Sequence, residues 1–312
     1  MTIHFWGVRG SIATPLIPQQ IRAKITAALQ RATPENVVSD EAREQFAASL
    51  PEWLFGTVGG NTPCVELTTA GQEKLIFDAG TGIRALGKWG TPPQNLHYNL
   101  LFSHLHWDHI QGLPFFTPLY DPAVSFDIYA PIGDIRERLS RQMQPPYYPV
   151  TFDALTKHIT FHTVRPGEPF SVGGVTVNLT PMSHPGGSFA YSVEEDGRKF
   201  VYATDVELRA SDFERTGERC AVFEGADAIV IDSQYTVEEA YQKQDWGHSA
   251  FCYAIDFAIA WQIKKLYLFH LEPAYDDEKL YSILQSARWY ADYASRDGVE
   301  VALAVEGEEF QV

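Results

Sequence analysis

Short segments of alternating or continuous apolar residues, typical of β-strands, recur in both halves of this chain. The pattern predicts a first strand over residues 2–8 and a hairpin over 63–82 that turns at Ala70 and Gly71. Further strands are predicted, several with glycine-centred turns, at 96–104, 124–131, 158–164, 170–182, 189–205, 228–236 and 265–270.

Residues 18–57 change to helical spacing, in two segments over 18–32 and 39–55. Ser39 before two acidic residues is a typical helix N-terminus. Because a segment of roughly 40 residues is marginally stable alone, we expect a helical insertion within a single domain of residues 1–312. Helices are also predicted at 134–143, 249–263 and 276–294. Strands with interspersed helices favour an α/β fold in which helices cover the sheets.

The composition favours an ordinary globular protein, since 45% of the 312 residues are hydrophobic and 21% are charged. The beginning of the chain lacks a basic stretch followed by a long apolar run, and no segment approaches the ~20 apolar residues that span a bilayer. The three cysteines, Cys64, Cys220 and Cys252, are scattered, which argues against a disulfide framework or a zinc knuckle. We therefore expect a cytoplasmic protein with no membrane partner.

The formal net charge of −16 disfavours long nucleic acid as a partner, because such a chain repels a polyanion. No alternation of aromatic residues with basic clusters offsets this charge. A small anion that is held by metal ions remains compatible with it.

The stretch "SHLHWDHIQG" (103–112) places three histidines and an aspartate within six positions. Side chains two apart in an extended segment point the same way, so His104 and His106 can reach one metal ion together. If the chain then turns into a helix, Asp108 and His109 point toward a second ion nearby. The alternative, polar residues on an exposed loop, fits a lone histidine better than this cluster.

Four ligands cannot fill two coordination spheres, so further ligands are expected at other strand ends. His184, Asp205 and His270 each follow a predicted strand. His97, His158 and His162 precede, flank or lie within strands, where roles on the sheet surface are expected, and His4 lies inside the first strand.

The order His-x-His-x-Asp-His, then His184, Asp205 and His270, resembles the metallo-β-lactamase superfamily. The resemblance implies a four-layered αββα sandwich with two divalent metal ions at one edge. It assigns His104, His106 and His184 to one ion and Asp108, His109 and His270 to the other, with Asp205 bridging them. Zinc suits these ligands best, and manganese or iron are alternatives.

Four further segments, "GVRGS", "GGNTPCVEL", "FDAGTGIR" and "PPYYPV", are similar to a group related to phosphoribosyl cyclic phosphodiesterases, cyclic-nucleotide phosphodiesterases and tRNA 3′-processing nucleases. Asp78 matches a residue that supports the metal-binding histidines in this family; a turn-capping aspartate is the alternative. Relatives that cut phosphodiesters also carry a histidine outside the metal ligands, which His248 matches, with Asp232 as its acidic partner. A structural histidine at a helix start is the alternative for His248.

These features predict a dinuclear metal-dependent phosphodiesterase with a small cyclic or linear substrate. Asp108 and Asp205 would hold a bridging hydroxide that attacks phosphorus, and His248 would protonate the leaving oxygen with help from Asp232. The glycine- and lysine-rich arm by which tRNA-processing relatives hold RNA has no counterpart in this sequence.

Two other functions remain open at this point: hydrolysis of a thioester, lactone or lactam carbonyl, in which His248 has no evident role, and a non-enzymatic redox or sensing module. Residues 18–57, Tyr147 and Tyr148 are candidates for a pocket wall or a homodimer contact, with plain packing as the alternative. The natural substrate, the native metal and the oligomeric state are not determined by the sequence.

Overall fold

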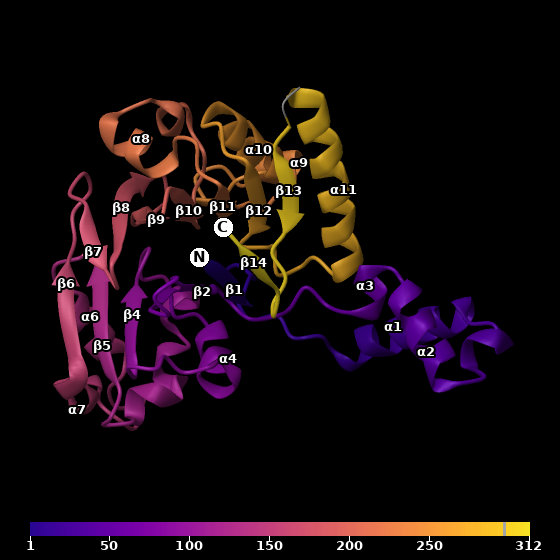
Figure 1. Ribbon diagram of the computed structural model, residues 1–312, viewed down its shortest axis with the longest axis horizontal. Helices are drawn as coiled ribbons and strands as arrows, with labels where there is room; N and C mark the ends of the chain where they lie inside the picture. Colours follow the sequence, from indigo (N-terminus) through magenta and orange to yellow (C-terminus); the bar gives the residue numbers. More distant parts are fainter. Residues whose placement is uncertain (296–297) are drawn as a thin grey trace.

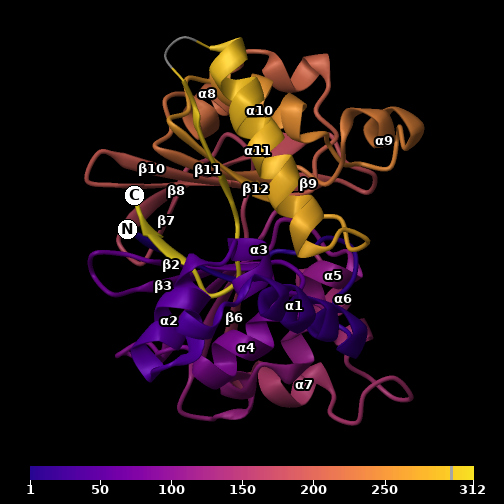
Figure 2. The ribbon, with the colours of Figure 1, turned by 90° about the vertical axis from the view of Figure 1, so that its right-hand side faces the viewer.

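The computed structural model of the chain describes residues 1–295 and 298–312. Two seven-stranded sheets face each other (Figures 1 and 2). The first contains, in spatial order, β14 (Glu309–Gln311), β1 (Thr2–Gly7), β2 (Cys64–Thr68), β3 (Lys74–Phe77), β4 (His97–Leu101), β5 (Ser125–Ala130) and β6 (Ile159–Thr163). The second contains β13 (Glu300–Leu303), β12 (Lys265–Phe269), β11 (Ala228–Asp232), β10 (Arg198–Ala203), β9 (Ser188–Glu195), β8 (Val175–Met182) and β7 (Phe170–Val172).

Helices cover the outer faces of both sheets. Those beside the first sheet are α4 (Gly82–Trp89), α5 (Trp107–Ile110), α6 (Ile135–Gln142) and α7 (Phe152–Leu155). Those beside the second are α8 (Gly217–Phe223), α9 (Val237–Gln242), α10 (Phe251–Ala260) and α11 (Asp277–Ala294). Short 3₁₀ turns connect other segments: η2 (Leu113–Phe115), η3 (Thr117–Tyr120), η4 (Thr156–His158) and η5 (Ala210–Phe213). This arrangement confirms the predicted αββα sandwich.

Two apolar cores hold the layers together. The larger lies between the sheets and extends to α10 and α11, and its fully buried aromatic residues include Phe77, Tyr202 and Phe269. The smaller lies between the first sheet and its helices, where Ile83 and Leu86 of α4 and Leu139 of α6 meet the sheet. Because both faces of each sheet are buried over much of their area, the site is held by rigid layers.

Parallel pairing brings the ends of several strands to one edge. β3 pairs in parallel with β4, and β10, β11 and β12 pair in parallel with one another. The register sets Phe77 opposite Leu101 and Asp232 opposite Phe269, so the residues that follow these strands emerge together. Ligands of α/β proteins bind beyond the carboxyl ends of the strands, and this edge carries the polar residues that the sequence singled out.

Residues 18–57 form helices between β1 and β2, as predicted: α1 (Pro18–Arg31), η1 (Pro34–Val37), α2 (Asp40–Ser49) and α3 (Glu52–Phe55). Figure 1 shows α1 and α2 projecting to one side of the body. That the chain is a single domain stays a prediction. No helix in the described part of the chain is both long and apolar enough to cross a membrane.

Candidate metal centre

Two groups of side chains converge at the strand ends, and they share one carboxylate. His104, His106, His184 and Asp205 form one group, and Asp108, His109, Asp205 and His270 form the other. Within each group, the candidate ligand atoms lie within 4.8 Å of one another. The structure therefore brings together all seven residues that the sequence nominated as ligands, and that they bind metal ions in two sets stays a prediction.

Asp205 directs its two oxygens toward different groups. Oδ2 lies 3.5 Å from His104 Nε2 and 3.7 Å from His184 Nε2. Oδ1 lies 3.1 Å from His109 Nε2 and 3.2 Å from His270 Nε2. Ligands about 2.0–2.1 Å from a tetrahedral zinc ion are about 3.3–3.4 Å apart, so these spacings suit one ion on each side of the carboxylate.

Hydrogen bonds fix the orientation of four histidine rings. The Nδ1 atom of His104 lies 3.0 Å from Ser103 Oγ, and that of His109 lies 2.8 Å from Asp78 Oδ2. The Nδ1 atom of His184 lies 2.9 Å from the Gly247 carbonyl oxygen, and that of His270 lies 3.0 Å from Gln234 Oε1. Since Ser103 donates its own hydroxyl hydrogen to Asp78, it accepts from His104. In a neutral ring whose proton is on Nδ1, Nε2 is the atom that can bind a metal ion.

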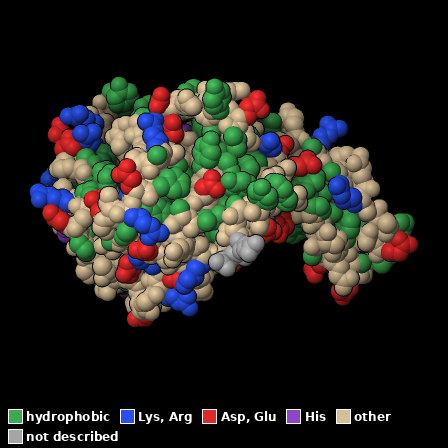
Figure 3. All heavy atoms as spheres, turned by 90° about the horizontal axis from the view of Figure 1, so that it is seen from above, with side chains coloured by type: hydrophobic (Ala, Val, Ile, Leu, Met, Phe, Trp, Pro, Cys, Tyr) green, Lys and Arg blue, Asp and Glu red, His purple; other side chains and the backbone are tan. Residues whose placement is uncertain are grey.

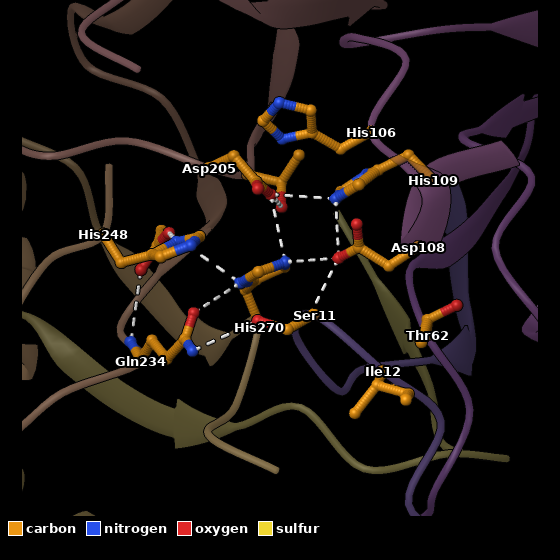
Figure 4. A network of polar contacts seen from close by, with 12 residues as sticks. Ser11, Ile12, Thr62, His106, Asp108, His109, Asp205, Gln234, His248 and His270 are labelled. Atoms are coloured by element: carbon orange, nitrogen blue, oxygen red, sulfur yellow. Dashed lines mark hydrogen bonds and ion pairs between the residues drawn. The ribbon is translucent and has the colours of Figure 1, made fainter. Parts of the chain in front are cut away.

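In His106, by contrast, Nδ1 is the ring nitrogen that faces the group, and it lies 3.1 Å from His184 Nε2. Figure 4 shows His109 and His270 converging on the carboxylates of Asp108 and Asp205. The second group is the more compact, because Asp108 Oδ2 lies 3.3 Å from His109 Nε2 and 3.1 Å from His270 Nε2.

The donor set fits divalent metal ions. The Nε2 atoms of His104 and His109 are buried and have no hydrogen-bond partner among the described residues. A buried polar atom without a partner costs free energy, and an ion at each position would satisfy these nitrogens. Imidazole with carboxylate oxygen is a ligand combination that zinc accepts.

The pKa shifts of these residues reflect their burial and their mutual charges. Burial alone would raise the pKa of Asp205, but the charges of His109, His270 and His104 together hold it well below its usual range. Burial alone would lower the pKa of His109, but Asp205, Asp108 and Asp78 raise it well above its usual range. Burial lowers the pKa of His104 and His184, which keeps these rings neutral and able to bind a metal.

Asp78 supports the centre from behind. Its Oδ2 accepts hydrogen bonds from Ser103 Oγ at 2.6 Å, His109 Nδ1 at 2.8 Å and Tyr202 Oη at 2.9 Å. Its Oδ1 accepts the Ser103 backbone N–H at 2.8 Å. The single carboxylate thus connects β3, the metal-binding loop after β4, and β10.

Three residues that follow strands at this site have strained backbone. Asp78, Asp205 and His270 have φ values of 59°, 49° and 56°, in the left-handed region that residues other than glycine rarely adopt. Each follows its strand by one or two residues, so the strained turn directs the side chain into the centre. Such strain persists where the surrounding structure enforces it and is common at functional sites.

His248 lies beside the metal groups and pairs with Asp232, as predicted. Its Nδ1 is 2.6 Å from Asp232 Oδ2, and its ring stacks on His270 with the ring centres 4.8 Å apart. Burial alone would lower the pKa of His248, but Asp232, with smaller effects of Asp205 and Asp108, raises it to about 9. The ring Nε2–H is thereby available as a proton donor.

Several residues that support the site were not predicted from the sequence, among them Ser11 and Gln234. Ser11 donates its backbone N–H to Asp108 Oδ2 at 2.8 Å, and Gln234 engages His270 Nδ1. Gln234 is two residues beyond Asp232 at the end of β11, and this position is the signal that could have identified it. A backbone donor such as that of Ser11 leaves no mark in the sequence.

Three other histidines that the sequence analysis named lie away from the candidate metal centre. On the first sheet, His97 Nε2 lies 3.5 Å from Asp127 Oδ2, and His162 Nε2 lies 3.4 Å from Asp127 Oδ1. His4 pairs with Glu309. Trp107, the first residue of α5, is 82% exposed.

Tyr147 and Tyr148 differ in their contacts and in their exposure. Tyr148 packs edge-to-face on Phe115 and donates its hydroxyl hydrogen to the Pro114 carbonyl, whereas Tyr147 is 82% exposed. Packing therefore accounts for Tyr148 and not for Tyr147.

The family model of the beta-lactamase superfamily domain matches residues 73–271. The chain belongs to the metallo-β-lactamase superfamily. Ribonuclease Z of Haloferax volcanii is 24% identical in an alignment over 306 residues. The alignment covers 80% of this chain and 94% of that protein. The superfamily membership agrees with the donor geometry of the two groups.

Solved structures of this superfamily share the fold. Human tRNase Z, short form, superposes with a TM-score of 0.64 at 19% identity, covering 100% of this chain and 99% of its own. A diphosphatase from the PhnP family superposes with a TM-score of 0.62 at 16% identity, covering 100% of this chain and 97% of its own. At these identities the similarity establishes the fold.

Proposed function

We propose that this protein is a dinuclear metal-dependent phosphodiesterase that hydrolyses a small cyclic or linear phosphodiester. The observation that carries the proposal is Asp205, whose two oxygens face two separate histidine groups beside the Asp232–His248 pair. The names of the relatives, a ribonuclease and a diphosphatase, support reaction at phosphorus.

In this proposal His104, His106, His184 and Asp205 hold one ion, and Asp108, His109, His270 and Asp205 hold the other. When bound, two such ions would lower the pKa of a water from ~16 toward ~7 and offset charge on the phosphate oxygens. Ser103, Asp78, Gly247 and Gln234 keep the ligand rings in place, so little reorganisation is needed when substrate arrives.

His248 has the role of proton donor. Asp232 holds Nδ1, and its carboxylate also accepts backbone N–H groups of Gln234 and Ser249, each at 3.2 Å. The Nε2–H therefore has one fixed direction, from which it can donate to the leaving oxygen of the substrate. General acid catalysis of this kind contributes about 10²–10⁴-fold.

RNA is the second candidate substrate, because the relative from Haloferax volcanii is a ribonuclease. The net charge of −16 argues against it, since phosphate contacts supply most of the affinity for a nucleic acid. Hydrolysis of a thioester, lactone or lactam is the third, but it leaves the Asp232–His248 pair without a role.

One assay panel separates these functions. The purified protein, with its metal content quantified, is tested on bis-p-nitrophenyl phosphate, 2′,3′- and 3′,5′-cyclic nucleotides, a structured RNA with a 3′ extension, a thioester and a chromogenic lactam. We expect turnover of the small phosphodiesters. Faster turnover of the RNA, or turnover of the carbonyl substrates alone, contradicts the proposal.

A further inference from the structure

Two segments at the edge of the second sheet lie against each other beside the candidate centre. Turn 205–209, which begins with the carboxylate that both metal groups share, follows β10. Loop 245–249, which contains the candidate proton donor, precedes α10. Ser249 joins them, because its Oγ donates to the Val206 carbonyl at 2.6 Å and accepts the Leu208 backbone N–H at 2.9 Å. The place of the proton donor beside the metal groups therefore depends on how the loop is held to the turn.

Glu207 makes a second connection between the turn and the loop. Its Oε1 accepts the backbone N–H of Asp245, and its Oε2 accepts that of Gly247, each at 3.1 Å. Its own backbone N–H donates to the carbonyl of Ser183 at 2.8 Å, one residue before His184. The side chain is only 19% exposed, so it is partly shielded from water. Because charge-assisted hydrogen bonds are roughly twice as strong as those between neutral groups, this carboxylate is well placed to hold the loop.

The loop has a backbone conformation that needs support. Asp245 and Gly247 have φ values of 65° and 91°, in the left-handed region. Residues other than glycine rarely adopt this region, and they keep it where the surrounding structure enforces it. Backbone N–H groups in turns of this kind can converge on an anion. Here the anion is the side chain of Glu207, so one carboxylate stabilises the strained form of the loop.

The loop in turn supports two parts of the candidate centre. The carbonyl of Gly247 engages His184 Nδ1 at 2.9 Å. The next residue is His248, whose Nδ1 lies 2.6 Å from Asp232 Oδ2. A shift of the loop would therefore displace a candidate metal ligand and the candidate proton donor together.

An exposed ion pair beside the loop is a weaker connection. Arg209 Nη2 lies 2.6 Å from Asp245 Oδ1 and 3.4 Å from Glu207 Oε1, but the side chains of Arg209 and Asp245 are 52% and 84% exposed. Figure 3 shows charged side chains of both signs interspersed over one face of the molecule, so exposed opposite charges are an ordinary feature of this surface. Such pairs contribute little to stability because water and salt screen them. The two backbone N–H groups that Glu207 accepts are therefore the main support of the loop at this end.

We propose that Glu207 is a positioning residue of the candidate centre. By accepting two backbone N–H groups of loop 245–249, it keeps in place the carbonyl that orients His184 and the ring of His248. It is not among the residues of the two candidate metal groups and acts through the loop. The part of this inference that concerns His184 is about metal binding alone, whereas the part that concerns His248 rests on the proposed phosphodiesterase function.

Metal titration tests the part that concerns His184. The metal-free protein is titrated with Co²⁺, and binding is followed by visible absorption. Glu207→Ala removes both acceptor oxygens, and we expect one of two ions to bind about 10–100-fold more weakly than in the wild type, with the other unchanged. Glu207→Gln keeps the size of the side chain and one acceptor oxygen, so a smaller but measurable loss is expected.

Glu195→Ala is the matched control. Glu195 also accepts a backbone N–H, that of Ala70 at 3.0 Å, and its side chain is 15% exposed. It lies opposite the start of β10, whereas Asp205 follows the end of that strand, so both ions should bind as in the wild type. Because Ser249 still joins the loop to the turn when Glu207 is replaced, each variant should keep the circular dichroism spectrum of the wild type.

The leaving group of the substrate tests the part that concerns His248. Nitrophenolate leaves bis-p-nitrophenyl phosphate with little need for a proton, whereas opening of a 2′,3′-cyclic nucleotide releases an alkoxide that has to be protonated. At saturating metal, we expect Glu207→Ala to lower kcat for the cyclic nucleotide about 10-fold more than kcat for bis-p-nitrophenyl phosphate. A general loosening of the fold would lower both by the same factor.

The outcomes separate this inference from the proposed function. Wild-type affinity for both ions in Glu207→Ala, or equal losses of kcat for the two substrates, overturns the role of Glu207. If Glu207→Ala does not fold, wild-type affinity in Glu207→Gln overturns it. A wild type that hydrolyses neither phosphodiester contradicts the proposed function instead, and the metal titration then decides the role of Glu207.

Discussion

Asp232 Oδ2 lies 2.6 Å from His248 Nδ1, and the His248 ring stacks on His270 of the second metal group. The pair sits at the junction of β11 and the loop before α10, so a possible proton donor is fixed beside the centre without being needed to fill either group. We expect His248→Ala to lower kcat for small phosphodiesters by about 10²–10⁴-fold while two metal ions stay bound. Steady-state kinetics with metal analysis of the same sample measures both, and unchanged turnover of every phosphodiester would remove His248 from the mechanism.

The pH profile gives an independent test of the pair. His248 donates only when protonated, so activity falls as the pH rises through its pKa, which Asp232 and its neighbours raise to about 9 against the effect of burial. Asp232→Asn removes the main raising charge and should move the basic limb of the kcat profile to lower pH. A basic limb that does not move would show that the limb belongs to another group.

Asp205 is expected to be required for both metal ions. Asp205→Ala removes the oxygens that face His104 and His184 on one side and His109 and His270 on the other. We expect loss of activity together with a reduced metal content. His109→Ala should affect chiefly the second ion. Loss of activity at full metal occupancy in either variant would move that residue out of the ligand set.

Asp78 is expected to act through the ligands and not on the substrate. Asp78→Asn weakens the hydrogen bond to His109 Nδ1, and disturbing a carboxylate behind a metal ligand typically lowers metal affinity 10–100-fold. Competition with a chelator measures the affinity. Asp127→Asn is the matched control, since Asp127 also lies near two histidines, His97 and His162, but away from the centre. Equal affinity of the Asp78→Asn variant and the wild type would contradict the assignment.

Gly247 is expected to tolerate no side chain. Its φ is 91°, and a Cβ at this position would lie 2.3 Å from His184 Nδ1, the atom that its carbonyl normally engages. Gly247→Ala should therefore weaken the ion that His184 holds and leave the other in place. Metal titration should give one tight site instead of two, whereas Gly217→Ala, where the added carbon has open space, should keep two. Two tight sites in Gly247→Ala would argue against the role of this carbonyl.

Hydrophobic periodicity predicted many of the strands and helices, whereas the sandwich and the division of the candidate ligands came from the resemblance to the superfamily. The hairpin over 63–82 appears as β2 and β3 with Val65 opposite Phe77, and the segments over 18–32 and 39–55 contain the helices α1, α2 and α3. The sequence analysis did not predict α4, α7, α8, α9, β13 and β14, which are all short elements. β14 exists because it pairs with β1 at the other end of the chain, a contact that no local pattern records.

The sequence by itself nominated the residues of the candidate centre, since His and Asp side chains can bind a metal ion wherever the chain brings them together. The tertiary structure decided how these groups are shared and oriented. Parallel pairing across β10, β11 and β12 brings Asp205, Asp232 and His270 to one edge, and strained backbone at Asp205 turns its two oxygens toward different histidine groups. The orientation of each ring depends on partners distant in sequence, such as Gly247 for His184 and Asp78 for His109, because a hydrogen bond depends on distance and angle in space and not on separation along the chain.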